Sequence, residues 1–111
     1  MTIGELADKL GAKVLTQEVD LSREVLCGYA CDLLSWVMAR GKEGMAWATV
    51  QAHMNAVAVA VLADMSCIIG VENVQFDPAV IAKAEEEGVA LLSSEKSAYQ
   101  ISGIMYEAGI Q

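Results

Sequence analysis

Residues 46–70 read AWATVQAHMNAVAVAVLADMSCIIG, and this stretch decides the fold. It starts with a short apolar run, passes through a polar turn and an apolar helix, and ends in a second β-branched run. Similar short runs occur at Val25–Gly28 and Val89–Ser93. Strands that alternate with helices of this length are typical of βαβ units. We therefore predict a three-layer α/β/α fold with a mainly parallel sheet of four or five strands.

The sequence before residue 46 adds further elements. A first helix is predicted over Ile3–Leu10, with Thr2 and Glu5 forming a capping box at its start. A short strand is predicted at Ala12–Thr16. The remaining predicted helices span Asp32–Arg40, Met54–Met65, Pro78–Glu87 and the segment after Lys96.

Length and composition limit the class of protein. A chain of 111 residues has room for one domain, so we predict a single domain over 1–111. No segment approaches the roughly 18 uninterrupted apolar residues that span a membrane. The first residues lack the basic and apolar regions of a secretory signal. These features predict a cytoplasmic location.

Charge and cysteine content exclude several kinds of site. The formal net charge is −8, and the chain has no basic cluster, so neither nucleic acid nor a membrane is an expected partner. The chain has an odd number of cysteines, Cys27, Cys31 and Cys67, which argues against a set of disulfides. Their spacing fits neither a Cys-x-x-Cys redox motif nor a zinc site. We expect all three to be small buried apolar residues. The sequence predicts no metal site and no cofactor.

The predicted helix Met54–Met65 has no polar residue over 56–63. A helix that is apolar all round is covered on all sides, and a sheet covers only one face. We therefore expect a homodimer that buries part of Asn55–Met65 or of the neighbouring helix Leu33–Met38. One alternative is that helices of the same chain cover it. Another is that Val57–Val61 extends as a strand, because its β-propensity is strong.

Several segments resemble the DRTGG domain family. They are Ala30-x-Asp32-Leu33-Leu34-Ser35, Trp47–Asn55, Ala58-Val59-Ala60, Cys67–Gly70 and Ile81-x-x-Ala84-x-x-x-Gly88-Val89. The resemblance spans nearly the whole chain and implies a stand-alone domain similar to the N-terminal domain of HPr kinase/phosphorylase. It extends to the middle domain of some phosphate acetyltransferases and to the insert between CBS domains in regulated pyrophosphatases. The family's naming motif has Asp, Arg and paired Gly in the turn that is Gln51–Asn55 here, and this chain lacks them.

The motif content argues against a kinase. Phosphoryl transfer of the HPr kinase type needs a Gly-rich phosphate loop followed by Lys and Ser or Thr. Gly41-Lys42 is followed by Glu43 and lacks the upstream glycine. The resemblance thus implies the part of those enzymes that does no chemistry. We expect a non-catalytic regulatory or sensor module that binds a partner enzyme or a small ligand, such as a nucleotide or another anionic metabolite.

Candidate ligand-binding residues follow the predicted strands, because parallel sheets bind ligands where strands end and helices begin. His53 is the only histidine and stands at a helix start, flanked by the amides of Gln51 and Asn55. Asp32 is predicted to be a helix N-cap or a ligand contact, and Lys96 is the main local positive charge. The alternative function is a small enzyme that uses His53 in a strand-end cleft. The alternative role of His53 is capping or packing.

Two further turns, Glu72-Asn73 and Ser93–Ser97, follow the last two predicted strands. In a parallel sheet these turns lie on the same edge as Gln51–Asn55. Their residues are predicted to serve mainly as turn and cap residues. Backbone N–H groups at the helix starts would also suit a phosphate or a carboxylate.

Overall fold

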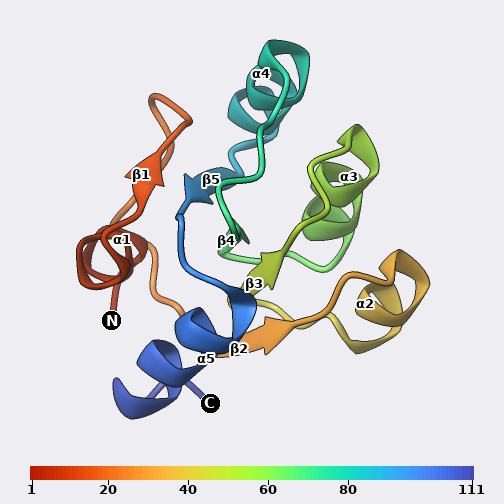
Figure 1. Ribbon diagram of the computed structural model, residues 1–111. Coiled ribbons are helices and arrows are strands. Elements are labelled where there is room, and N and C mark those ends of the chain that lie inside the picture. The colour runs from red at the N-terminus through yellow and green to blue at the C-terminus, as the bar shows by residue number, and fades with distance from the viewer.

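A computed structural model describes residues 1–111 as a five-stranded sheet between two layers of helices (Figure 1). The strands are β1 (Lys13–Val14), β2 (Cys27–Ala30), β3 (Met45–Thr49), β4 (Cys67–Gly70) and β5 (Ala90–Ser93). Their spatial order is β1-β5-β4-β3-β2. The last four strands are parallel, and β1 is antiparallel to β5. The predicted three-layer fold with a mainly parallel sheet is confirmed.

Three crossover helices cover one face of the sheet, and two helices cover the other (Figure 1). The crossover helices are α2 (Leu34–Arg40), α3 (Met54–Leu62) and α4 (Pro78–Glu87). Each links one parallel strand to its neighbour in the same direction, and crossovers of one hand then lie on one face. The opposite face carries α1 (Ile3–Leu10) and α5 (Ala98–Glu107). None of these helices has the length and apolar character needed to cross a bilayer.

The two faces of the sheet form two hydrophobic cores. Along β4, Cys67 and Ile69 pack in the core beneath α1 and α5, while Ile68 packs in the core beneath the crossover helices. Every residue of β3 and β4 is buried. Strands buried on both faces are apolar without alternation, which explains the continuous apolar runs around Trp47 and Ile68.

Helix ends follow the predicted local signals. Thr2 and Glu5 form the predicted capping box of α1, and Gly11 ends that helix in the left-handed conformation with φ of 62°. Pro78 opens α4, and Gly88 closes it in the same conformation with φ of 73°. These ends confirm the predictions for α1 and α4.

Other boundaries were predicted wrongly. The first strand is Lys13–Val14 rather than 12–16, and β2 is Cys27–Ala30 rather than 25–28. Val25 instead donates its backbone N–H to the Met1 carbonyl at 2.8 Å, outside the sheet. The helix predicted over 54–65 ends at Leu62, because the chain turns through Asp64, whose φ is 55°.

The apolar segment after His53 is a helix, so the alternative strand over 57–61 is wrong. Its sheet-facing side is buried, but Val61 and Leu62 are exposed, Leu62 to 74%. One chain therefore leaves part of this helix uncovered. The cysteines also differ from the prediction: Cys67 is buried, but Cys27 and Cys31 are only half-buried.

Candidate functional site

The carboxyl ends of the parallel strands meet at one edge of the sheet, and the predicted turns follow them there. Gln51–Asn55 follows β3, Glu72-Asn73 follows β4, and Ser93–Ser97 follows β5. The polar residues at this edge fall into two separate groups. One lies after β2 and β3, and the other lies after β4 and β5.

Asp32 organises the group after β2 and β3. Its Oδ1 accepts hydrogen bonds from Thr49 Oγ1 at 2.8 Å and from the Val50 backbone N–H at 2.9 Å. Its backbone carbonyl accepts a hydrogen bond from Gln51 Nε2 at 2.7 Å. The predicted N-cap role of Asp32 is wrong, because Leu33 occupies the N-cap of α2 without a side-chain hydrogen bond. Instead, the carboxylate accepts hydrogen bonds from the buried Thr49 hydroxyl and from the Val50 backbone N–H that follows β3.

His53 and Asn55 lie at the start of α3. His53 is the N-cap residue, and its Nδ1 accepts a hydrogen bond from the Asn55 backbone N–H at 3.2 Å. Both side chains are exposed. None of the cavities described below includes them or the side chains of Asp32 and Gln51. The structure therefore shows His53 in a capping geometry on an open surface.

Lys96 lies apart from these four residues. It follows β5, and the whole of β4 separates β5 from β3. Its Nζ donates a hydrogen bond to the Leu10 carbonyl at the end of α1, at 3.0 Å. The predicted site residues are thus divided between two places on the same edge of the sheet.

A polar cavity of about 370 Å³ lies at the ends of β4 and β5. It has no hydrophobic residue in its lining. The lining residues are Gly11, Lys13, Asn73, Ser93, Ser94, Glu95 and Lys96. Lys13 was not predicted from the sequence to be a site residue. It reaches this cavity only because β1 pairs with β5, where Lys13 stands opposite Ser93. No local pattern around residue 13 signals that pairing.

Backbone hydrogen bonds hold the two loops of this cavity together. The Glu72 N–H donates to the Lys96 carbonyl, and the Asn73 N–H donates to the Ser94 carbonyl, each at 2.8 Å. Ser94 in turn donates its N–H to Gly70 at 2.9 Å. Glu72 and Asn73 adopt left-handed backbone conformations, with φ of 53° and 57°. These hydrogen bonds tie the two loops that wall the cavity to each other.

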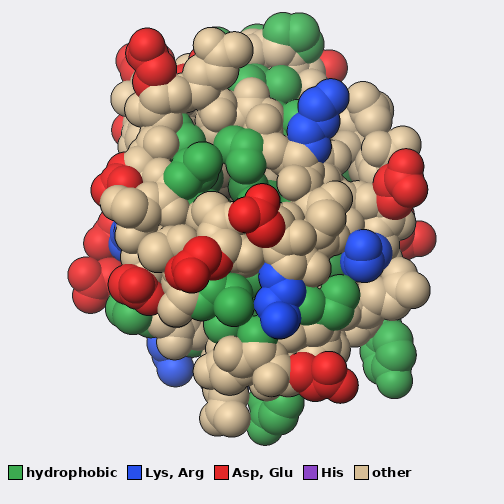
Figure 2. All heavy atoms as spheres, turned by 90° about the vertical axis from the view of Figure 1, so that its left-hand side faces the viewer, with side chains coloured by type: hydrophobic (Ala, Val, Ile, Leu, Met, Phe, Trp, Pro, Cys, Tyr) green, Lys and Arg blue, Asp and Glu red, His purple; other side chains and the backbone are tan.

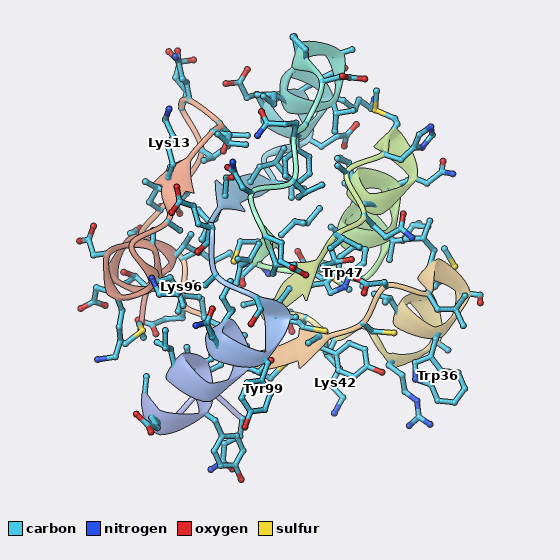
Figure 3. The ribbon with its side chains drawn as sticks, viewed as in Figure 1. Lys13, Trp36, Lys42, Trp47, Lys96 and Tyr99 are labelled. Carbon is cyan, nitrogen blue, oxygen red and sulfur yellow. The ribbon has the colours of Figure 1, made fainter.

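The side of the molecule formed by β1 and α1 carries acidic and basic side chains intermingled, rather than one basic patch (Figure 2). In Figure 3, Lys13 and Lys96 lie on this side, whereas Lys42 and Trp36 lie on the side of β2 and α2.

Two other hollows are less suited to hold a small ligand. A depression of about 720 Å³ runs along α5 between Tyr99 and Tyr106, but apart from Lys96 only α5 itself lines it. A groove of about 270 Å³ between α3 and α4 is mainly apolar and includes Val61 and Leu62. Ligand sites are usually concave and walled by several elements.

Groups suited to catalysis or metal binding are sparse. Burial raises the pKa of the Cys67 thiol to about 12, so this cysteine is a neutral thiol rather than a nucleophile. No three His, Cys, Asp or Glu side chains lie close enough together to hold a metal ion.

The fold is similar to a crystal structure of the CBS and DRTGG domains of the regulatory region of Clostridium perfringens pyrophosphatase, complexed with the activator diadenosine tetraphosphate. The TM-score is 0.77 at 12% sequence identity, and the match covers 94% of this chain and 45% of that chain. This chain thus spans less than half the length of the solved one. At this identity the likeness shows the fold alone. No family model matches the sequence, and no curated protein matches it.

Proposed function

We propose that residues 1–111 form a single domain of the DRTGG type, which acts as a non-catalytic regulatory or sensor module for a small ligand or a partner enzyme. One observation carries the proposal: the polar side chains at the end of β3 are used to order the chain itself. Asp32 holds two loops together, and the His53 ring caps α3. Groups committed in this way order the chain rather than react.

The structural comparison supports the same proposal. The solved pyrophosphatase chain is a regulatory region, and the molecule bound to it is a nucleotide activator. The resemblance of the sequence to DRTGG domains points in the same direction. We propose a nucleotide or another anionic metabolite as the class of ligand.

The alternative, a small enzyme that uses His53, has no specific observation in its favour. A general base must lie within hydrogen-bond reach of its substrate, in a pocket that positions it. His53 lies on an open surface, and its Nδ1 already accepts the Asn55 N–H.

A binding screen with a product assay tests the function. Purified protein is mixed with nucleotides and acyl phosphates, and its melting temperature is followed while the ligands are analysed by chromatography. The expected result is a ligand that raises the melting temperature and is recovered unchanged. Consumption of the ligand, or transfer of phosphate from ATP to a protein serine, would overturn the proposal.

We also propose that the module works as a homodimer in the cytoplasm, without nucleic-acid or membrane partners. Exposed apolar side chains on α2, its N-cap and α3 support the dimer, namely Leu33, Trp36, Met38, Val61 and Leu62. The three free cysteines suit a reducing compartment. The net charge of −8 disfavours polyanionic surfaces as partners.

A further inference from the structure

The cavity at the ends of β4 and β5 differs in charge from the other end of this sheet edge. Two of the seven Lys and Arg residues of the chain, Lys13 and Lys96, line it, together with one acidic residue, Glu95. After β3, the charged group in the hydrogen-bond network is the carboxylate of Asp32. An anionic ligand is therefore favoured at the β5 end and disfavoured at the β3 end.

Both lysines keep hydrogen-bond donors for a ligand. The Lys96 ammonium has three donors and uses one on the Leu10 carbonyl. The side chain of Lys13 is exposed, and its ammonium makes neither a hydrogen bond nor an ion pair within the chain. Its side chain extends toward solvent in Figure 3, on the same side of the molecule as Lys96. Lys96 is thus held beside Leu10 by a hydrogen bond, whereas the Lys13 ammonium has no partner within the chain.

The walls between the two lysines are polar and ordered. Ser93 stands opposite Lys13 across the β1–β5 pair, and opposed residues in an antiparallel pair project to the same face. Ser94 is only 4% exposed, and its Oγ accepts the Lys96 N–H at 3.1 Å, which leaves the hydroxyl hydrogen free to donate. The paired backbone of the two loops fixes these groups before a ligand binds, which lowers the entropic cost of binding.

We propose that this cavity binds a short phosphoanhydride chain, such as inorganic tripolyphosphate or the triphosphate of a nucleotide. This inference rests on the proposed regulatory function and names the chemistry of its ligand. Lysines on two different elements suit an extended row of charges better than a single anion. The cavity of about 370 Å³ has room for several phosphoryl groups. No hydrophobic or aromatic residue lines it to stack against a base.

Titration calorimetry at low ionic strength tests the inference with sodium tripolyphosphate, ATP and adenosine as probes. The test variant is Lys13→Ala, and the matched control is Lys42→Ala, an exposed lysine near β2, at the opposite end of the sheet from β1 (Figure 3). We expect tripolyphosphate to bind the wild type and adenosine not to bind. Lys13→Ala should weaken binding about tenfold or more, while Lys42→Ala should leave it within about twofold. Thermal unfolding of both variants checks that the fold is intact.

The ATP measurement distinguishes a nucleotide ligand from an inorganic polyphosphate. ATP binding that depends on Lys13 identifies a nucleotide, and tripolyphosphate binding without ATP binding identifies an inorganic chain. The inference is overturned if neither probe binds, or if both lysine variants lose affinity equally. Binding of adenosine that is insensitive to Lys13→Ala also overturns it, but leaves the regulatory function standing. Release of phosphate from either probe would instead overturn the regulatory function.

Discussion

At the residue scale, Asp32 bonds to a residue distant in the sequence rather than acting as the helix N-cap that its local sequence predicts. Its position before an apolar segment is typical of an N-cap, and the structure uses it instead to bind Thr49 and Val50, at 2.8 and 2.9 Å. Thr49 is fully buried, so its hydroxyl requires a partner. The side chain of Asp32 is thus a link between two loops at the carboxyl end of the sheet.

Replacing Asp32 with Ala should lower the free energy of unfolding by about 1–2 kcal/mol, because two hydrogen bonds to a carboxylate are lost. Urea denaturation measures the change. Asp77→Ala is the matched control, since the Asp77 side chain makes no capping hydrogen bond at α4. Its effect should stay within about 0.5 kcal/mol. Equal losses in the two variants would show that the Asp32 network adds nothing specific.

The cysteines provide a second test at this scale. At pH 8 a thiol reagent should label Cys27 and Cys31 in the native protein and reach Cys67 only after unfolding. The folded-state pKa of Cys67 is raised from 9.0 to about 12. Its contribution to stability is therefore present below pH 9 and lost as the pH rises toward 12. Three rapidly labelled thiols under native conditions would contradict this burial.

At the element scale, α2 and α3 have more apolar surface than one chain covers. Leu62 is 74% exposed, and Trp36, which lies 4.9 Å from the Arg40 guanidinium, is half exposed. Helices of a single chain usually place their large apolar residues toward the core. This excess is the physical ground for the proposed homodimer.

Light scattering coupled to gel filtration should give a dimeric mass for the wild type at micromolar concentration. Leu62→Glu should give a monomer, because a carboxylate replaces an apolar side chain in the interface. Tyr99→Glu changes an even more exposed residue on α5, in the opposite layer, and should leave the dimer intact. A monomeric wild type would rule out this interface, and so would dissociation caused by Tyr99→Glu alone.

The elements themselves were largely predictable from local sequence, but their partners were not. The apolar runs, the capping box at Thr2 and the Pro78–Gly88 helix depend on neighbours within a few residues, so they were found. The role of Asp32 depends on a residue 17 positions away. The place of Lys13 depends on a pairing with Ser93 across most of the chain. Both were missed, because such long-range contacts leave no mark on hydrophobic periodicity.

At the scale of the whole molecule, stability should be uneven. The central strands β3 and β4 are buried throughout, whereas β1 has two residues and α2 has seven and lacks a side-chain cap. Hydrogen exchange should therefore be slowest in β3 and β4 and fastest in β1 and α2. Mass spectrometry of peptides from the exchanged protein measures this order. Early exchange of Trp47 and Ile68 amides would show that the sheet is not the most stable unit.

The sheet also separates two hydrophobic cores, one on each of its faces, which can change in sequence independently. Leu6 packs in one core and Val57 in the other, with the sheet between them. Substitutions at such sites should add without coupling, since distant sites that share no partner behave independently. Each core then accumulates changes without constraining the other. That independence lets one backbone tolerate wide changes in sequence, such as the 12% identity between this chain and the solved structure with a similar fold.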